Sequence, residues 1–224
     1  MIQYLTDNLG RLLLLTLGHA ILSLVALLIS ILIGVTIGAY VGHLHKYSFL
    51  AINLGNVLRA LPTLALIAVM IALIGFGFVN ITIALVVLAL PLILTNSYTA
   101  VTGVDPGMVE AARGMGMTGM EILFRVELPN AIPLIMTGIR TAWVYTVATA
   151  YLAIFAGYAT RPGQLGTLGD IIGNPSGEST AGILVAAAFA IVLAFLGAGL
   201  LTLAERAMTP TGIKLARAAA TAPA

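Results

Sequence analysis

The sequence contains no cysteine and very little charge. Without cysteine the chain can form no disulfide and no thiolate metal site. Only 8% of its 224 residues are charged, against about 25% in a typical soluble domain. Hydrophobic residues make up 60% of the chain, and the mean hydropathy is +1.10. This composition argues against a soluble domain and predicts a chain that lies in a lipid bilayer.

Several motifs that carry chemistry are also absent. The sequence has no GxxxxGK[ST] phosphate loop, no HExxH pattern and no GxSxG pattern, and no basic stripe suits nucleic acid. His43 and His45 could share a metal ion, but two imidazoles at a membrane boundary are more often interfacial anchors. We therefore expect this chain not to be an enzyme, with no catalytic residue, no metal site and no cofactor of its own.

Long tracts without charge predict the membrane spans. The tract 12–45 would measure about 50 Å as a helix, which exceeds the ~30 Å core of a bilayer, and it fits one tilted span better than a cleaved leader. The tract 60–104 is long enough for two crossings, with a turn at residues 75–80. The sequence thus predicts an all-α polytopic membrane protein with five spans near 12–45, 50–74, 79–101, 131–156 and 181–204.

Small residues and prolines mark special points in these spans. Gly34, Gly38 and Gly42 recur every four residues, which either lets a second helix backbone approach closely or reflects the ordinary tolerance of glycine in membrane helices. We expect Pro62 and Pro91 to kink the second and third spans.

Basic residues predict the orientation, because cytoplasmic loops carry an excess of Lys and Arg. With five spans, the loops 42–49 and 102–130 share one side with the C-terminus. That side holds six basic residues, namely Lys46, Arg113, Arg125, Arg206, Lys214 and Arg217. The other side holds Arg11 and Arg161. We therefore expect the C-terminus inside the cell and the N-terminus outside.

The loop 105–130 has a structure of its own. Asp105 and Pro106 form a strong helix start, with a capping carboxylate before a proline at the first helical position. We expect a short helix over residues 108–113, broken by Gly114 and Gly116 because glycine accepts positive φ without strain.

A second short helix is predicted directly after these glycines. Thr118 and Glu121 have the spacing of a capping box, which marks a helix N-terminus. We expect Leu128-Pro129 to end this helix just before the next span. The loop would then form a helix–turn–helix knob that protrudes from the membrane.

The same loop carries a longer pattern. Glu110-Ala111-Ala112 is followed after three residues by Gly116 and, after nine more, by Val126, any residue, and Leu128-Pro129. This resembles the signature loop of permease subunits of binding-protein-dependent ATP-binding-cassette (ABC) importers, which has isoleucine where this chain has Val126. The resemblance implies that 105–130 is a cytoplasmic coupling loop whose motif residues meet an ATPase subunit: Glu110, Ala111, Ala112, Gly116, Leu128 and Pro129. The alternative is a plain connector between two spans.

The resemblance covers roughly residues 15–215, and within these residues the chain is similar to the osmoprotectant branch of these permeases. It is carried by the tracts 58–63, 114–117, 125–129, 135–142 and 209–215, which read LRALPT, GMGM, RVELP, IMTGIRTA and TPTGIKL. That branch imports quaternary ammonium compounds such as glycine betaine, carnitine and choline. Permeases of the methionine type share the five-span plan and remain an alternative. The loop 157–169 departs from the compact GAGGLG run of many osmoprotectant permeases.

The resemblance also implies an assembly. It implies one type I importer permease domain over residues 1–224, with a cytoplasmic tail at 207–224, in a bacterial cytoplasmic (inner) membrane. Two permease chains, either two copies or two similar chains, would bind ATPase subunits that carry ATP and Mg²⁺. A substrate-binding protein would dock outside near residues 157–180.

Other kinds of transporter remain alternatives. No Asp or Glu lies well inside a predicted span, whereas proton- or sodium-coupled carriers normally need such a carboxylate. A secondary transporter is therefore the weaker hypothesis, and a channel would leave the 105–130 pattern unexplained. Trp143, Tyr145 and Tyr151 could line the translocation path, since aromatic faces attract quaternary ammonium ions, or could serve packing alone. Arg140 could snorkel to the interface or pair with Glu127 or a phospholipid.

Overall fold

The computed structural model describes residues 1–45, 48–158 and 165–213, and all the regular secondary structure in these residues is helical. Lys46, Arg161, Lys214 and Arg217, which contributed to the predicted orientation, lie outside the described residues. The elements are α1 (Ile2–Leu44), α2 (Ser48–Ala60), α3 (Thr63–Ile74), α4 (Phe78–Thr102), α5 (Pro106–Gly114), α6 (Gly119–Ile122), the π-helical η1 (Leu123–Glu127), α7 (Leu128–Thr149), the 3₁₀-helical η2 (Ala150–Ile154), α8 (Gly169–Ile172) and α9 (Thr180–Met208).

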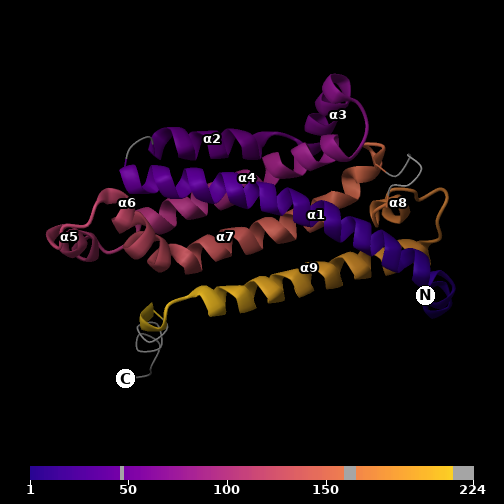
Figure 1. Ribbon diagram of the computed structural model, residues 1–224. Helices are drawn as coiled ribbons and strands as arrows, with labels where there is room; N and C mark the ends of the chain where they lie inside the picture. The colour runs from indigo at the N-terminus through magenta and orange to yellow at the C-terminus, as the bar shows by residue number, and fades with distance from the viewer. Residues whose placement is uncertain (46–47, 159–164, 214–224) are drawn as a thin grey trace.

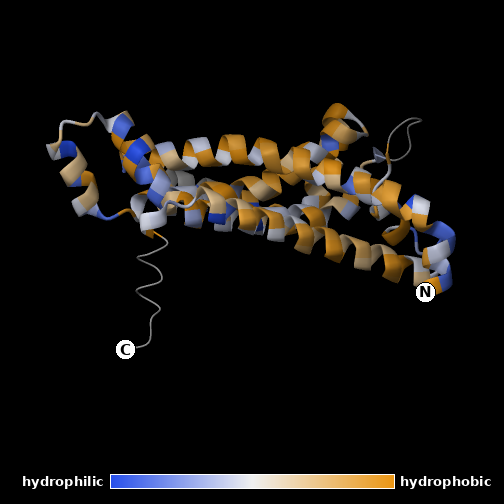
Figure 2. Ribbon diagram, turned by 60° about the horizontal axis from the view of Figure 1, so that its bottom comes forward, coloured by the Kyte–Doolittle hydropathy of each residue, from blue (hydrophilic) through white to orange (hydrophobic). Residues whose placement is uncertain are grey.

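The long helices form an elongated bundle with polar ends. Figure 1 shows α1, α4, α7 and α9 running along one common direction, with α5 and α6 at the end of the bundle opposite the N-terminus. Figure 2 shows that apolar residues cover the length of these helices, while hydrophilic residues gather at the two ends. Below, the end with α5 and α6 is called the knob end, and the end with residue 1 is called the N-terminal end.

Four helical segments in the described residues are long and apolar enough to cross a membrane. They are Ile2–Leu44, Phe78–Thr102, Gly119–Ile154 and Thr180–Met208. They confirm four of the five predicted spans. The first is one unbroken helix of 43 residues, about 65 Å at ~1.5 Å per residue, so it extends well beyond the ~30 Å bilayer core.

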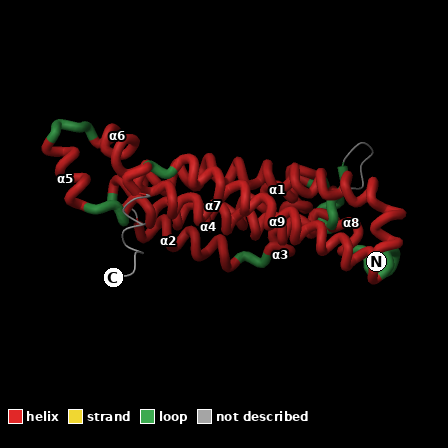
Figure 3. Tube along the Cα trace, turned by 90° about the horizontal axis from the view of Figure 1, so that it is seen from below, coloured by secondary structure: helices red, strands yellow, loops and turns green. Residues whose placement is uncertain are grey.

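The second predicted span, 50–74, is not one helix. It is divided into α2 and α3 at Leu61-Pro62, where Pro62 adopts an extended conformation with ψ of 122°. Proline lacks an N–H group, and its ring disfavours helical geometry in the residue before it, so the expected kink is a complete break. Figures 1 and 3 show α2 lying along the bundle beside α4, with α3 turned out of line after the break. Pro91, by contrast, lies inside the continuous α4.

The glycine pattern of α1 serves a close helix contact. A Cβ atom added at Gly38 would lie 2.5 Å from the carbonyl oxygen of Leu94 in α4, and one at Gly42 would lie 3.0 Å from that of Tyr98. At Gly34 it would meet the side chain of Ile93 at 3.0 Å. Of the two interpretations of this pattern, the structure therefore supports close approach of two backbones.

Candidate functional site

The knob is built by local capping interactions, as the sequence predicts. The Asp105 carboxylate accepts a hydrogen bond from the Gly107 N–H at 2.8 Å and so caps α5. Thr118 and Glu121 form the expected capping box at the start of α6. Between the two helices only Gly116 has positive φ, at 82°, whereas Gly114 is still part of α5. The turn between the helices therefore depends on Gly116.

The motif residues of α5 are divided between the knob surface and its interior. Glu110 and Ala111 are exposed, and so is Gly116. Ala112 is buried at 1% exposure, and its carbonyl accepts a hydrogen bond from the Met117 N–H at 3.2 Å. Ala112 thus holds the knob together, while the other three face the outside.

Large apolar side chains are exposed on this polar end of the molecule. Met108 is 44% exposed, Met115 72%, Met120 51% and Phe124 60%. Met108, Met115 and Met120 lie on or directly beside α5 and α6 at the knob end (Figure 1), and Phe124 lies on η1, which continues from α6 into α7. Exposed apolar side chains outside a membrane are typical of partner surfaces, and methionine adapts readily to a partner's shape.

Leu128-Pro129 does not end the second helix, so that prediction is wrong. α6 continues through η1 into α7 without a break, and both motif residues are half-buried at the start of α7. The π-helical turn explains this, because the Leu128 N–H bonds to the Leu123 carbonyl five residues back. Pro129, which has no N–H to donate, is accommodated in the first positions of α7.

Glu127 belongs to a buried pair that sequence reasoning missed. Its Oε2 lies 2.6 Å from Nδ1 of His43 in the last turn of α1, and the Glu127 side chain is only 2% exposed. The sequence favours His43 as an interfacial anchor and offers Glu127 as one partner for Arg140. Both residues fall at the same predicted membrane boundary, and that shared depth is the signal in the sequence that could have linked them.

Arg140 pairs with α9 instead. Its Nη2 donates to Oε2 of Glu205 at 2.8 Å, and its Nη1 donates to the Thr202 hydroxyl at 3.0 Å. The pair is partly buried, with side-chain exposures of 30% for Arg140 and 15% for Glu205. It connects the middle of α7 to the knob end of α9.

The three aromatic candidates for the translocation path lie in different environments. Trp143 is buried at 6% exposure, and its indole N–H donates to the Ala194 carbonyl of α9 at 3.0 Å. A Cβ at Gly197 would overlap the Trp143 ring, so this ring fills the space above a glycine of α9. Tyr145 is 51% exposed and Tyr151 37%. The structure thus does not bring the three together in this chain.

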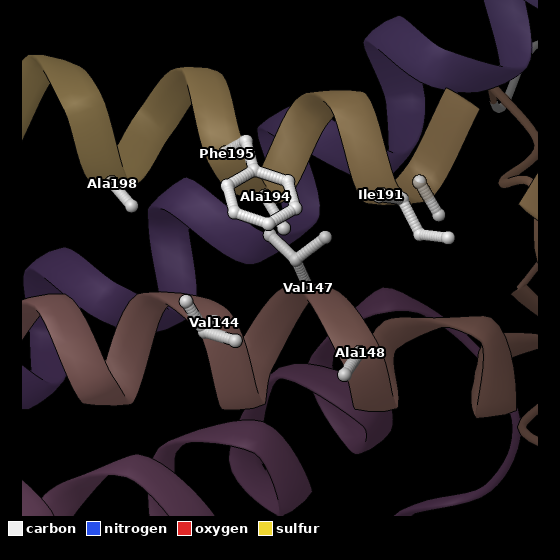
Figure 4. Close-up of a pocket in the computed structure, with 8 residues that line it drawn as sticks. Val144, Val147, Ala148, Ile191, Ala194, Phe195 and Ala198 are labelled. Atoms are coloured by element: carbon white, nitrogen blue, oxygen red, sulfur yellow. The ribbon is translucent and has the colours of Figure 1, made fainter. Parts of the chain in front are cut away.

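A groove between α7 and α9 is entirely apolar. It has a volume of about 300 Å³ and lies beside the Trp143 contact. Figure 4 shows side chains of both helices pointing toward one another across it, with Val147 of α7 opposite Ala194 and Phe195 of α9. It offers no polar group to a charged solute, so it is not a candidate substrate site.

A polar cluster at the N-terminal end joins α1 to the segment that precedes α9. Glu178 accepts from the Tyr4 hydroxyl at 2.8 Å and pairs with Arg11 at 2.7 Å. Partial burial acts to raise the pKa of Glu178, but the hydrogen bonds from Tyr4 and Arg11 prevail and lower it. The pKa of Asp170 in α8 is raised, because burial outweighs the Thr167 N–H and the Arg11 charge.

No group of three or more His, Cys, Asp or Glu side chains in the described residues is placed to hold a metal ion. His43 and His45 lie close together, but Nδ1 of His45 is 3.0 Å from the carbonyl of His43 and not directed to a shared site.

The apolar bundle with its capped, protruding knob defines a class of protein, a helical protein with several membrane spans. Its fold is that of solved ABC importer permeases. It matches a chain of the MetNI methionine ABC transporter with a TM-score of 0.77 and 23% identity, covering 91% of this chain and 99% of that one. It matches an amino acid ABC transporter with a TM-score of 0.72 and 21% identity, covering 92% and 98%.

Residues 30–210 match the family "binding-protein-dependent transport system inner membrane component", and the chain belongs to this family. It is 35% identical to the choline transport system permease protein OpuBB of Bacillus subtilis, over 95% of both chains. It is 35% identical to the glycine betaine/carnitine/choline permease OpuCB of the same organism, over 96% of both chains. It is 34% identical to the carnitine transport permease OpuCB of Listeria monocytogenes, again over 96% of both. The chain is thus homologous to osmoprotectant permeases.

Proposed function

We propose that this chain is the permease subunit through which a quaternary ammonium osmoprotectant is imported across the cytoplasmic membrane. The observation that carries the proposal is the similarity, over nearly the whole of each chain, to permeases for choline, carnitine and glycine betaine. The match to the methionine transporter is at 23% identity and supports the fold alone. Methionine is therefore the competing solute in the test.

The knob is the proposed contact with an ATPase subunit, which would carry ATP and Mg²⁺. Glu110 and Ala111 lie exposed on α5, Gly116 sets the turn, and exposed methionines flank them. The small, exposed Ala111 allows a partner groove to approach the helix closely, and methionine side chains adapt to its walls, whereas the buried Ala112 serves the contact by holding the knob together. Leu128 and Pro129 serve the contact indirectly, because they lie at the start of α7 and connect the knob to the bundle.

This role places the knob end in the cytoplasm. Among the described residues, Arg113, Arg125 and Arg206 lie at or near that end, and Arg11 lies in the other half of α1. The excess of basic residues agrees with a cytoplasmic knob and an outer N-terminal end. A binding protein would dock on the outer end near residues 157–180. A second permease chain, identical or similar, would complete the path, with Tyr145 and Tyr151 exposed to face it.

The test is uptake by the whole transporter, with its ATPase and binding protein, of labelled glycine betaine, choline, carnitine and methionine. We expect ATP-dependent uptake of at least one quaternary ammonium compound and none of methionine. Gly116→Val should reduce this uptake about tenfold or more, since a β-branched residue is strained at φ of 82°. Gly116→Asn is the matched control, because asparagine tolerates positive φ, and it should retain most of the activity.

Uptake of methionine alone would overturn the proposed solute and leave the architecture in place. Normal uptake by the Gly116→Val complex would overturn the coupling role of the knob.

A further inference from the structure

The His43–Glu127 pair lies where three elements meet. His43 belongs to the last turn of α1, and Glu127 is the last residue of η1, directly before α7. The imidazole also lies near the knob, since a Cβ added at Gly119, the first residue of α6, would lie 3.3 Å from Nε2 of His43. One side chain of α1 therefore binds the end of η1 and lies beside the start of α6.

The contact between the two residues is directional and shielded from water. A carboxylate has only acceptors, so the Nδ1–H of His43 donates to Oε2 of Glu127 across 2.6 Å. The side-chain exposures are 16% for His43 and 2% for Glu127. Losing one partner of such a pair leaves the other buried without it, so the two side chains stay together when their helices shift.

Stability alone does not account for a polar pair at this place. Replacing a buried ion pair by apolar residues of similar size is often neutral or stabilising. The neighbouring contact of α1 with α4 is made by glycines and apolar side chains. A directional hydrogen bond at the end of α1 transmits a pull as well as a push. Apolar surfaces can slide past one another and do not transmit a pull.

We propose that His43 and Glu127 are positioning residues that make α1 follow the knob. When a bound ATPase moves α5 and α6, η1 moves with them, and the pair carries that displacement into α1. Because the backbones of α1 and α4 are in close contact at Gly38, a push from α1 also reaches α4. This inference rests on the coupling function proposed above, and it adds to that function a residue pair that lies behind the docking surface.

The test measures coupling in the assembled transporter, as solute molecules taken up per ATP hydrolysed. The first variant is Glu127→Met, which keeps the length of the side chain and removes both its charge and its hydrogen-bond acceptors. The second is the double variant His43→Leu/Glu127→Met, which keeps an apolar packed contact and removes the bond. The matched control is His45→Asn, which changes the exposed neighbouring histidine at φ of 50°, a conformation that asparagine tolerates.

We expect both pair variants to assemble and hydrolyse ATP within about twofold of the unmodified complex, with uptake per ATP reduced about tenfold. The control should keep its uptake per ATP. Because the two residues act as one unit, the double variant His43→Leu/Glu127→Met should be no worse than Glu127→Met alone.

Normal uptake per ATP in either pair variant, while the Gly116→Val complex is defective, would overturn the inference and leave the coupling function intact. If the double variant does not assemble, the single Glu127→Met variant decides alone. Normal uptake by Gly116→Val as well would instead overturn the proposed function of the knob, and the inference with it.

Discussion

Helices α4 and α9 are both long and apolar, yet they are held in the bundle in opposite ways. α4 packs along its length against α1, α2, α3 and α7, and half of the residues in its most apolar stretch are buried. α9 contacts α7, α1 and the short α8, and only 11% of the residues in its most apolar stretch are buried. Close backbone contact fixes α4, whereas α9 presents most of its surface to its surroundings.

Polar contacts near its two ends hold α9 in place. Glu178, just before the helix, is bound by Arg11 and Tyr4, and Glu205 in its last turns is bound by Arg140. Between them lie the Trp143 hydrogen bond and the apolar groove of Figure 4. Lipid tails are as apolar as leucine, so apolar contact alone does not fix a membrane helix, and these polar contacts define its position.

The largest effect is expected from breaking the backbone contact of α4. Gly38→Leu places a side chain where even a Cβ lies 2.5 Å from the Leu94 carbonyl, and we expect a loss of about 3 kcal/mol or more of stability. Gly199→Leu on α9 is the control, because nothing lies within 4 Å of its Cβ. The measurement is the yield of monodisperse protein in mild detergent and its unfolding temperature. Equal stability of the two variants would contradict the conclusion that close backbone contact fixes α4 and not α9.

The sequence predicts the parts of this molecule that depend on local or periodic patterns. The caps at Asp105 and Thr118, the turn at Gly116 and four of the five long spans are confirmed because each depends on residues close together in the chain or on a continuous apolar run. The glycine spacing of α1 showed where a close contact could form, without naming α4 as the partner.

The remaining features depend on tertiary contacts or on competing local rules. Pro62 and Pro91 are both prolines in apolar tracts, yet one ends a helix and the other lies inside one, because α4 is packed on several sides and α3 is not. The pairing of Glu127 with His43 and of Arg140 with Glu205 joins residues far apart in the chain. No spacing rule connects them, so only their common depth in the membrane could have indicated the pairs.

A smaller effect is expected from removing the contact at the knob end of α9. Arg140→Met deletes the two hydrogen bonds to Glu205 and Thr202 and should cost about 1–3 kcal/mol, since one partner is charged. Arg206→Met, which changes an exposed residue of α9 next to Glu205, should change the stability by no more than about 0.5 kcal/mol. Adding Glu205→Gln to Arg140→Met should recover part of the loss, as a double-mutant cycle in the unfolding temperature would show. Additive losses would contradict the pairing.

The smallest effect is expected at the other end, where Glu178 makes the contact at the membrane surface. Its pKa in the folded chain lies below the unfolded value, so its contribution is present above the unfolded pKa and is lost as the pH falls through the folded one. Asp170, whose pKa is raised, changes stability with pH in the opposite sense. It is present both in the unmodified chain and in a Glu178→Gln variant, so it does not contribute to the difference between them. The unfolding temperature of the unmodified chain should therefore exceed that of Glu178→Gln near pH 7, by an amount equivalent to less than about 1 kcal/mol. The difference should vanish on acidification below the lowered folded-state pKa of Glu178. A difference that persists in acid would mean that Glu178 stabilises α9 through packing, and that the two ends of this helix are held by different means.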